Sequence, residues 1–199
     1  MRSQRRYVNE DGTSNIQSSF LSCEKDTELI LRKLFIDSRP YSEELKRLLL
    51  INTKDCLDDT TNRVYLARLK EATLPVMIEE GYIRTTPRID LDENNEVQSY
   101  LVITFDNFTP SSNGYYRDCT IMIDIICNID TWDLTNYRKR PLKIAGYVDG
   151  ILNEAKLTGI GTLNFLSANE IVLNENLAGY CLVYSAVHGD DDTIESENE

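Results

Sequence analysis

The sequence predicts an α+β domain in which helices pack on one face of an antiparallel β-sheet. Helical periodicity dominates the first part of the 199 residues, up to Gly81. After Gly81 the apolar residues recur with a period of two, which is typical of strands, and one further helical stripe interrupts them. Because helices come first and strands follow in runs, the order favours α+β over a regularly alternating parallel α/β sheet.

The chain divides into three parts. Residues 1–21 are polar and are interpreted as a flexible N-terminal arm, either a frayed terminus or a segment that orders on a partner. Residues 22–188 form the predicted domain, with a helical elaboration at 22–80. Residues 189–199, "GDDDTIESENE", contain six acids and no bases, so we expect an acidic disordered tail that supplies half of the formal net charge of −12.

Capping and breaking residues define the predicted helices. Ile30, Leu31 and Leu34 share one face of a helix that follows residue 22. A second helix begins at Ser42, a good N-cap that is followed by two glutamates. A third helical region follows Asn62 and is interrupted or kinked at Pro75. Gly81 is expected to end it as a C-cap.

Alternating polarity predicts the sheet. The expected strands are residues 82–91, 97–108, 115–128, 161–166, 170–173 and 178–188. Strand 115–128 has one wholly apolar face and one mixed face, which is typical of a sheet that is covered on one side and half covered on the other. A helix begins near Pro141, and its Gly146 and Gly150 suggest close packing on the sheet.

No residue pattern indicates a catalytic, metal or cofactor site. The five cysteines contain no Cys-x-x-Cys pair and are interpreted as buried thiols, not as a disulfide framework. His188 is the only histidine, and no local nucleophile or third group accompanies it. We therefore expect no enzyme, although a site assembled from distant residues is an open alternative.

Charge and hydropathy limit the partners. No run approaches the about 18 apolar residues that a membrane helix needs, so no membrane partner is expected. The basic N-terminus is not followed by an apolar run, so we expect synthesis in a cytoplasm without a secretory signal. The net charge of −12 disfavours binding of nucleic acid along the general surface.

The loop at residues 129–141 is the leading candidate for protein contacts. It carries aromatic and basic side chains, the types enriched at interface centres: Trp132, Tyr137, Arg138, Lys139 and Arg140. The alternative for Trp132 is packing on its own sheet. Tyr115 and Tyr116 form a second candidate patch. A basic run on an acidic protein favours head-to-tail contacts, which close into rings when the rotation between subunits allows. Reversal of the three bases to Glu is then expected to block assembly without loss of stability.

Four segments carry a family resemblance: "SYLVITFDNF", "YYRDCTIMIDIICNI", "RPLKIAGYVDGILNE" and "AGYCLVYSAVHG". In element order and character, residues 80–188 resemble the tail-terminator or tail-completion proteins of tailed bacteriophages.

The resemblance implies a non-enzymatic virion protein, made in the cytoplasm of a host bacterium. Six or twelve copies would form a ring at the head–tail junction, between the portal or connector and the tail proteins. DNA would pass through the lumen without being bound. A small cytoplasmic adaptor that binds one partner through a sheet edge or a loop, without a ring, is the alternative.

Overall fold

The computed structural model describes residues 19–58, 63–86, 97–110, 117–157 and 161–188. The helices are α1 (Ser19–Arg32) with a π-helical continuation (Lys33–Asp37), α2 (Tyr41–Leu50), α4 (Leu66–Glu71), α5 (Leu74–Glu79) and α6 (Arg140–Leu152). The strands are β1 (Ile83–Arg84), β2 (Ser99–Pro110), β3 (Arg117–Asn128), β4 (Lys156–Leu157), β5 (Gly161–Thr162), β6 (Asn164–Val172) and β7 (Leu177–His188). The α+β class is thus confirmed.

The main sheet has five strands in the order β1-β2-β3-β7-β6. Strands β2, β3, β7 and β6 pair antiparallel, whereas β1 runs parallel to β2. The expectation of a purely antiparallel sheet is therefore wrong at this edge. The chain enters β1 through the turn after α5, in which the Tyr82 N–H donates to the Met77 carbonyl and the Gly81 N–H, at φ +77°, donates to the Ile78 carbonyl. This Schellman arrangement confirms Gly81 as the predicted cap.

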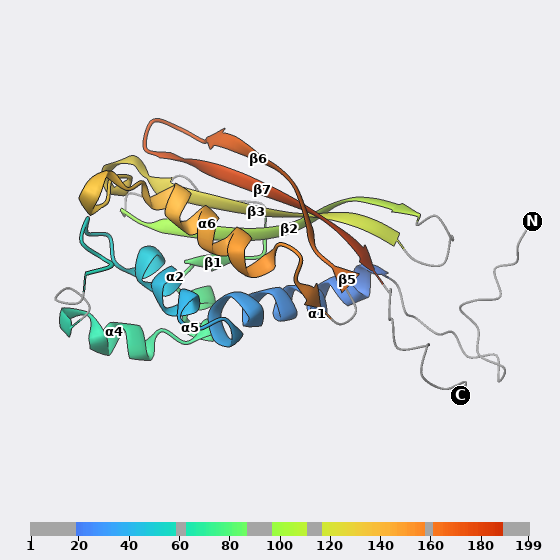
Figure 1. The fold of residues 1–199 in the computed structure, drawn as a ribbon, viewed down its shortest axis with the longest axis horizontal. Helices are drawn as coiled ribbons and strands as arrows, with labels where there is room; N and C mark the ends of the chain where they lie inside the picture. Colours follow the sequence, from blue (N-terminus) through green and yellow to red (C-terminus); the bar gives the residue numbers. More distant parts are fainter. Residues whose placement is uncertain (1–18, 59–62, 87–96, 111–116, 158–160, 189–199) are drawn as a thin grey trace, which may run out of the picture.

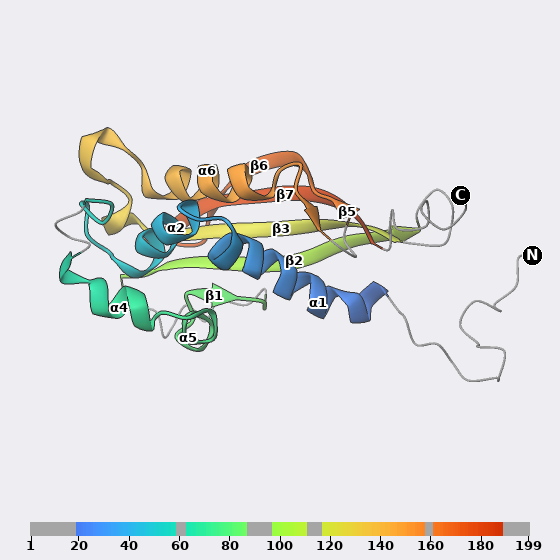
Figure 2. The same cartoon turned by 60° about the horizontal axis from the view of Figure 1, so that its bottom comes forward.

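Helices α1, α2 and α6 cover one face of the sheet (Figure 1). The predicted apolar face of β3 is buried, and it joins the apolar faces of β2 and β7 in one large core with these helices. On the opposite face, a smaller buried cluster contains Tyr100, Val102, Ile126 and Leu177. Figure 2 shows α4 and α5 beside the β1 edge, far from β6. No helix in the part of the chain that the structure describes is long and apolar enough to cross a membrane.

Several predicted boundaries change. Helix α1 begins at Ser19, three residues before the predicted start. The strands predicted at 161–166 and 170–173 are wrong, because residues 164–172 form the single strand β6, and Gly161–Thr162 pairs instead with β4. The polar residues Ser167 and Asn169, in the middle of β6, hid its continuity.

The prediction for the two helix glycines is also wrong. A Cβ atom on Gly146 or Gly150 would meet nothing within 4 Å. Both residues are exposed on the outer side of α6, beside Leu142, where they line a shallow hollow of about 370 Å³. The helix packs on the sheet through Ile144, Val148 and Leu152 instead.

Candidate assembly surface

The loop before α6 is anchored by Arg140, whose side chain is fully buried. Its Nε donates to the Thr131 carbonyl at 2.8 Å, and its Nη1 donates to the carbonyls of Leu48 at 2.5 Å and Ile51 at 2.9 Å. Its Nη2 donates to the Thr53 carbonyl at 2.8 Å. Two of these acceptors lie at the C-terminal end of α2, where helix carbonyls lack intrahelical partners and carry partial negative charge. Arg140 therefore ties the loop to α2.

Arg140 is consequently not a contact residue, and that prediction is wrong. Its neighbour Lys139 forms a salt bridge with Asp133 in its own loop, and this contact lowers the pKa of Asp133. Only Arg138 keeps an exposed charge unpaired by any described residue. The expectation that the triple reversal to Glu preserves stability is wrong as well, because a buried glutamate at position 140 would face carbonyl oxygens.

The loop tip presents Tyr137. Its side chain is 100% exposed, and its backbone lies in the left-handed region at φ 59°, directly after Asn136 at φ 60°. The tip is held in place by hydrogen bonds from Leu134 N–H to the Arg138 carbonyl and from Thr135 N–H to the Lys54 carbonyl, both at 2.9 Å. Asparagine tolerates this conformation, whereas tyrosine rarely adopts it. Tyr137 is therefore a strained, fully exposed aromatic residue on a loop that is held in place. These properties are expected of a residue that contributes strongly to a protein interface.

Of the other predicted contact residues, one is described by the structure and two are not. Trp132 is half-buried and packs against the core, as its alternative interpretation predicted. Tyr115 and Tyr116 lie outside the described residues.

Strand β6 is a second exposed surface, which the sequence did not single out as a contact site. It forms one edge of the main sheet. Val172 is 68% exposed and Leu166 is 55% exposed. The pairing with β7 shifts between Phe165 and Ser167, so Leu166 is an extra, bulged residue. Edge strands are usually protected by Lys, Pro or a bulge; β6 has the bulge at Leu166 but no Lys or Pro, and Glu170 is its only charge. Such an edge is a template for pairing with another chain.

Among the described residues, we find no cluster of side chains that resembles a catalytic or metal-binding site. Within those residues, no group of three His, Cys, Asp or Glu side chains is placed to hold a metal ion. His188 is the last residue of β7, opposite Arg117 of β3. Four of the five thiols are buried, and Cys23 is half-buried.

Replacement of Tyr137 by Asn is expected to raise the free energy of unfolding by about 1 kcal/mol, because Asn tolerates the left-handed backbone. The same variant should weaken assembly, since the exposed ring is lost. Tyr41→Asn is the matched control, because Tyr41 is also exposed but contacts the Tyr147 ring and begins a regular helix. Urea unfolding measures the change in stability, and sedimentation measures the change in assembly. Unchanged assembly by the Tyr137 variant would exclude the tip as a contact.

Comparisons with known proteins place the chain in a family. A search of curated proteins gives no match. A chain from a solved structure described as "Virion of native gene transfer agent (GTA) particle" is similar over 62% of this chain and 91% of that chain, with 16% identity and a TM-score of 0.36. A likeness at this level carries no functional inference. The family model YomW matches residues 42–186, most of the folded domain. The chain therefore belongs to the YomW family, a phage-associated family.

Proposed function

We propose that this protein is a non-enzymatic structural component of a phage particle, and that copies of it join into a ring at the head–tail junction. In this role it connects the portal or connector to the tail. Membership of a phage-associated family supports the proposal that the protein is a component of a phage particle. The single observation that carries the assembly is the edge strand β6, in which Leu166 is 55% exposed, Val172 is 68% exposed and Glu170 is the only charged residue.

The arrangement of the two exposed surfaces supports a head-to-tail contact. Strand β6 ends one edge of the sheet, and the Tyr137 loop extends from the N-terminal end of α6 (Figure 1). These are different surfaces of one subunit, so a contact between them is heterologous and closes into a ring when the rotation allows. The net charge of −12 suits a channel through which DNA passes, because an acidic wall adds no phosphate-neutralising contacts.

The double variant Leu166→Lys/Val172→Lys is expected to remain folded and to lose assembly. Both side chains are mostly exposed, so each change should alter the free energy of unfolding by no more than about 0.5 kcal/mol. Lysine on an edge strand opposes pairing with another chain. Native mass spectrometry and negative-stain images of the protein, alone and mixed with the portal and tail proteins of its phage, measure the loss.

The matched control is Val64→Lys/Ile78→Lys, which also converts two exposed apolar residues to lysine. These residues belong to the helical elaboration, far from β6 (Figure 2). The control should assemble like the wild-type protein. Full assembly by the β6 variant would refute the role of this edge. A complex with a single partner copy and no ring would favour the adaptor function instead.

A further inference from the structure

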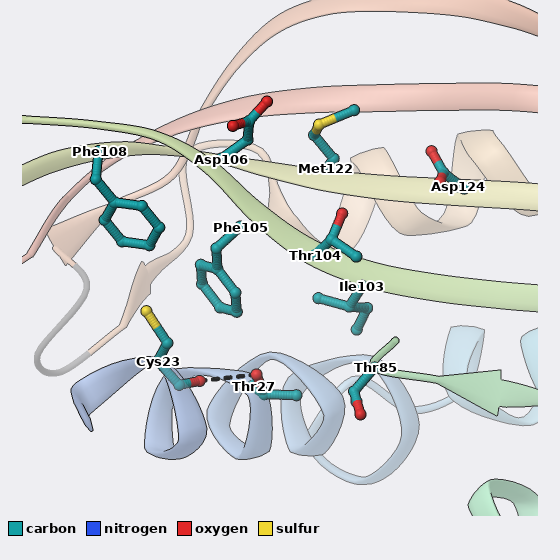
Figure 3. A pocket seen from close by; sticks show the side chains of 10 residues that line it. All are labelled: Cys23, Thr27, Thr85, Ile103, Thr104, Phe105, Asp106, Phe108, Met122 and Asp124. Atoms are coloured by element: carbon teal, nitrogen blue, oxygen red, sulfur yellow. Dashed lines mark hydrogen bonds between the residues drawn. The ribbon is translucent and has the colours of Figure 1, made fainter. Parts of the chain in front are cut away.

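The outer face of α6 carries a hollow of about 370 Å³ whose lining residues are all described: Tyr41, Leu142, Lys143, Gly146, Tyr147 and Gly150. A larger hollow of about 770 Å³ lies between α1 and β2, where Cys23 and Thr27 lie opposite Phe105 (Figure 3). Thr85 at its rim is followed closely in the chain by residues 87–96, which lie outside the described part, so its extent is not defined. The hollow on α6 is the better-defined surface.

The residues along this face of α6 have complementary shapes. Leu142 is 52% exposed, and a Cβ atom on Gly146 or Gly150 would meet nothing within 4 Å. Because the three residues are spaced by four, they form one line along the helix. Leu142 projects at one end of this line, whereas Gly150 leaves a gap at the other end. The projection and the gap are equally far from Gly146.

Aromatic side chains fix the flank of the hollow. The rings of Tyr41 and Tyr147 pack with their centroids 5.7 Å apart, and the Tyr147 hydroxyl donates to the Glu44 carboxylate. The Lys143 ammonium group lies 4.5 Å from the centre of the Tyr147 ring. These contacts join α6 to α2, so the hollow is formed before any partner binds. The line of Leu142 and the two glycines itself belongs to α6 alone.

The accessible charges of this segment change sign at Gly146. Apart from the buried Arg140, the bases precede Gly146 and the acids follow it: Arg138, Lys139 and Lys143, then Asp149 and Glu154. Lys139 pairs with Asp133, and Asp149 accepts a hydrogen bond from Tyr184. Among the described residues, no salt bridge involves Lys143 or Glu154. A second α6 that runs in the opposite direction places its acidic end beside this basic end.

We propose that the outer face of α6 binds the same face of a second copy, with the two helices antiparallel and a two-fold axis at Gly146. Such an axis brings residues at equal distances from Gly146 to the same level. Leu142 of each copy then fills the gap at Gly150 of the other. Lys143 of each copy lies on the same flank as Glu154 of the other.

This pairing is weak and closed. One helix pair covers a small area, at the low end of specific interfaces, so we expect a dissociation constant in the micromolar range. The net charge of −12 on each copy adds repulsion. A two-fold contact is complete with two copies, and the α6 face is separate from β6. The inference therefore goes beyond the proposed function and requires no ring.

Cysteine cross-linking of the full-length, purified protein tests the antiparallel arrangement. Leu142→Cys and Gly150→Cys are prepared as separate variants, and diamide is the oxidant. A mixture of the two should give roughly tenfold more disulfide-linked dimer than either variant alone, because only the mixture brings two new thiols to one level. Val64→Cys, which is exposed on another part of the surface, should give no more dimer than the wild-type protein. Equal yields in the mixture and in the single variants would refute the antiparallel arrangement.

Filling the hollow separates pairing from folding. Gly150→Gln should raise the melting temperature by about 3 °C, because Gln favours a helix over Gly and the site is open. The same variant should lose self-association in sedimentation equilibrium. Self-association equal to that of the wild-type protein would show that pairing uses another surface. Wild-type protein that stays monomeric up to about 0.5 mM would refute the proposal outright.

A charge exchange tests the two ends of the contact. Lys143→Glu should weaken pairing about tenfold, and Lys143→Glu/Glu154→Lys should restore most of the loss. Failure of the double variant to recover would refute the charge complementarity. The Leu166→Lys/Val172→Lys variant should pair through α6 like the wild-type protein, so the α6 contact and the β6 contact are measured independently. Loss of pairing in that variant would assign the self-association to β6 instead.

Discussion

Replacement of Arg140 by Met is expected to lower the free energy of unfolding by about 4 kcal/mol. The guanidinium group is fully buried and donates four hydrogen bonds to backbone carbonyls, at 2.5–2.9 Å. Methionine keeps much of the apolar stem but leaves three buried carbonyl oxygens and the part-buried Thr53 oxygen without this donor, and each buried loss costs about 1–3 kcal/mol before relaxation and water entry. Arg140→Lys should restore little, because one ammonium group cannot span the fork of acceptors.

Arg138→Met is the matched control for this prediction. Arg138 is two residues away, carries the same charge and is exposed. Its replacement should change the free energy of unfolding by less than about 0.5 kcal/mol. Urea denaturation of both variants, followed by circular dichroism, gives the comparison. Equal stabilities would show that Arg140 does not anchor the loop to α2.

Replacement of Gly179 by Ala is expected to destabilise the protein by about 3 kcal/mol or more. Gly179 lies in β7 opposite Ile126 of β3, at the centre of the sheet. An added Cβ would lie 1.7 Å from the Ile125 carbonyl oxygen, which is backbone and cannot turn away. The two central strands would have to separate locally and weaken their ladder.

Gly146→Ala is the control for the same chemical change. A Cβ at Gly146 meets nothing within 4 Å, and the residue is in an exposed part of α6. Alanine favours a helix over glycine by about 1 kcal/mol, so this variant should be more stable than the wild-type protein. Thermal unfolding should therefore move in opposite directions for the two variants. A tolerated alanine at position 179 would contradict the close approach of β3 and β7.

The sequence predicted those elements whose signals are local. Alternation in strand β3 gave its buried face correctly, because each apolar residue reports directly on one side of a strand. Gly81 was placed correctly at a helix end, and the interruption of the third helical region near Pro75 was also predicted, although Pro75 lies in the first turn of a new helix, α5. The α+β class followed from the order of these elements.

Features set by distant contacts were missed. Arg140 resembled its neighbours Arg138 and Lys139 in the sequence, and only the position of the α2 carbonyls shows that it is buried. The parallel pairing of β1 with β2 was also not visible in a local pattern. For β6 a partial signal existed, because Phe165, Leu166, Ile171 and Val172 lie close together in the sequence with Glu170 as the only charge.

Amide hydrogen exchange at β6 tests the central claim most directly, since that claim is that this edge joins one copy to the next. Exchange of residues 164–172 is measured in the isolated subunit and in the assembled particle. We expect amides of this strand to exchange at least tenfold more slowly in the assembly, while those of the exposed helices α4 and α5 keep their rates. Equal exchange at β6 in both states would show that the edge stays open and that assembly uses another surface.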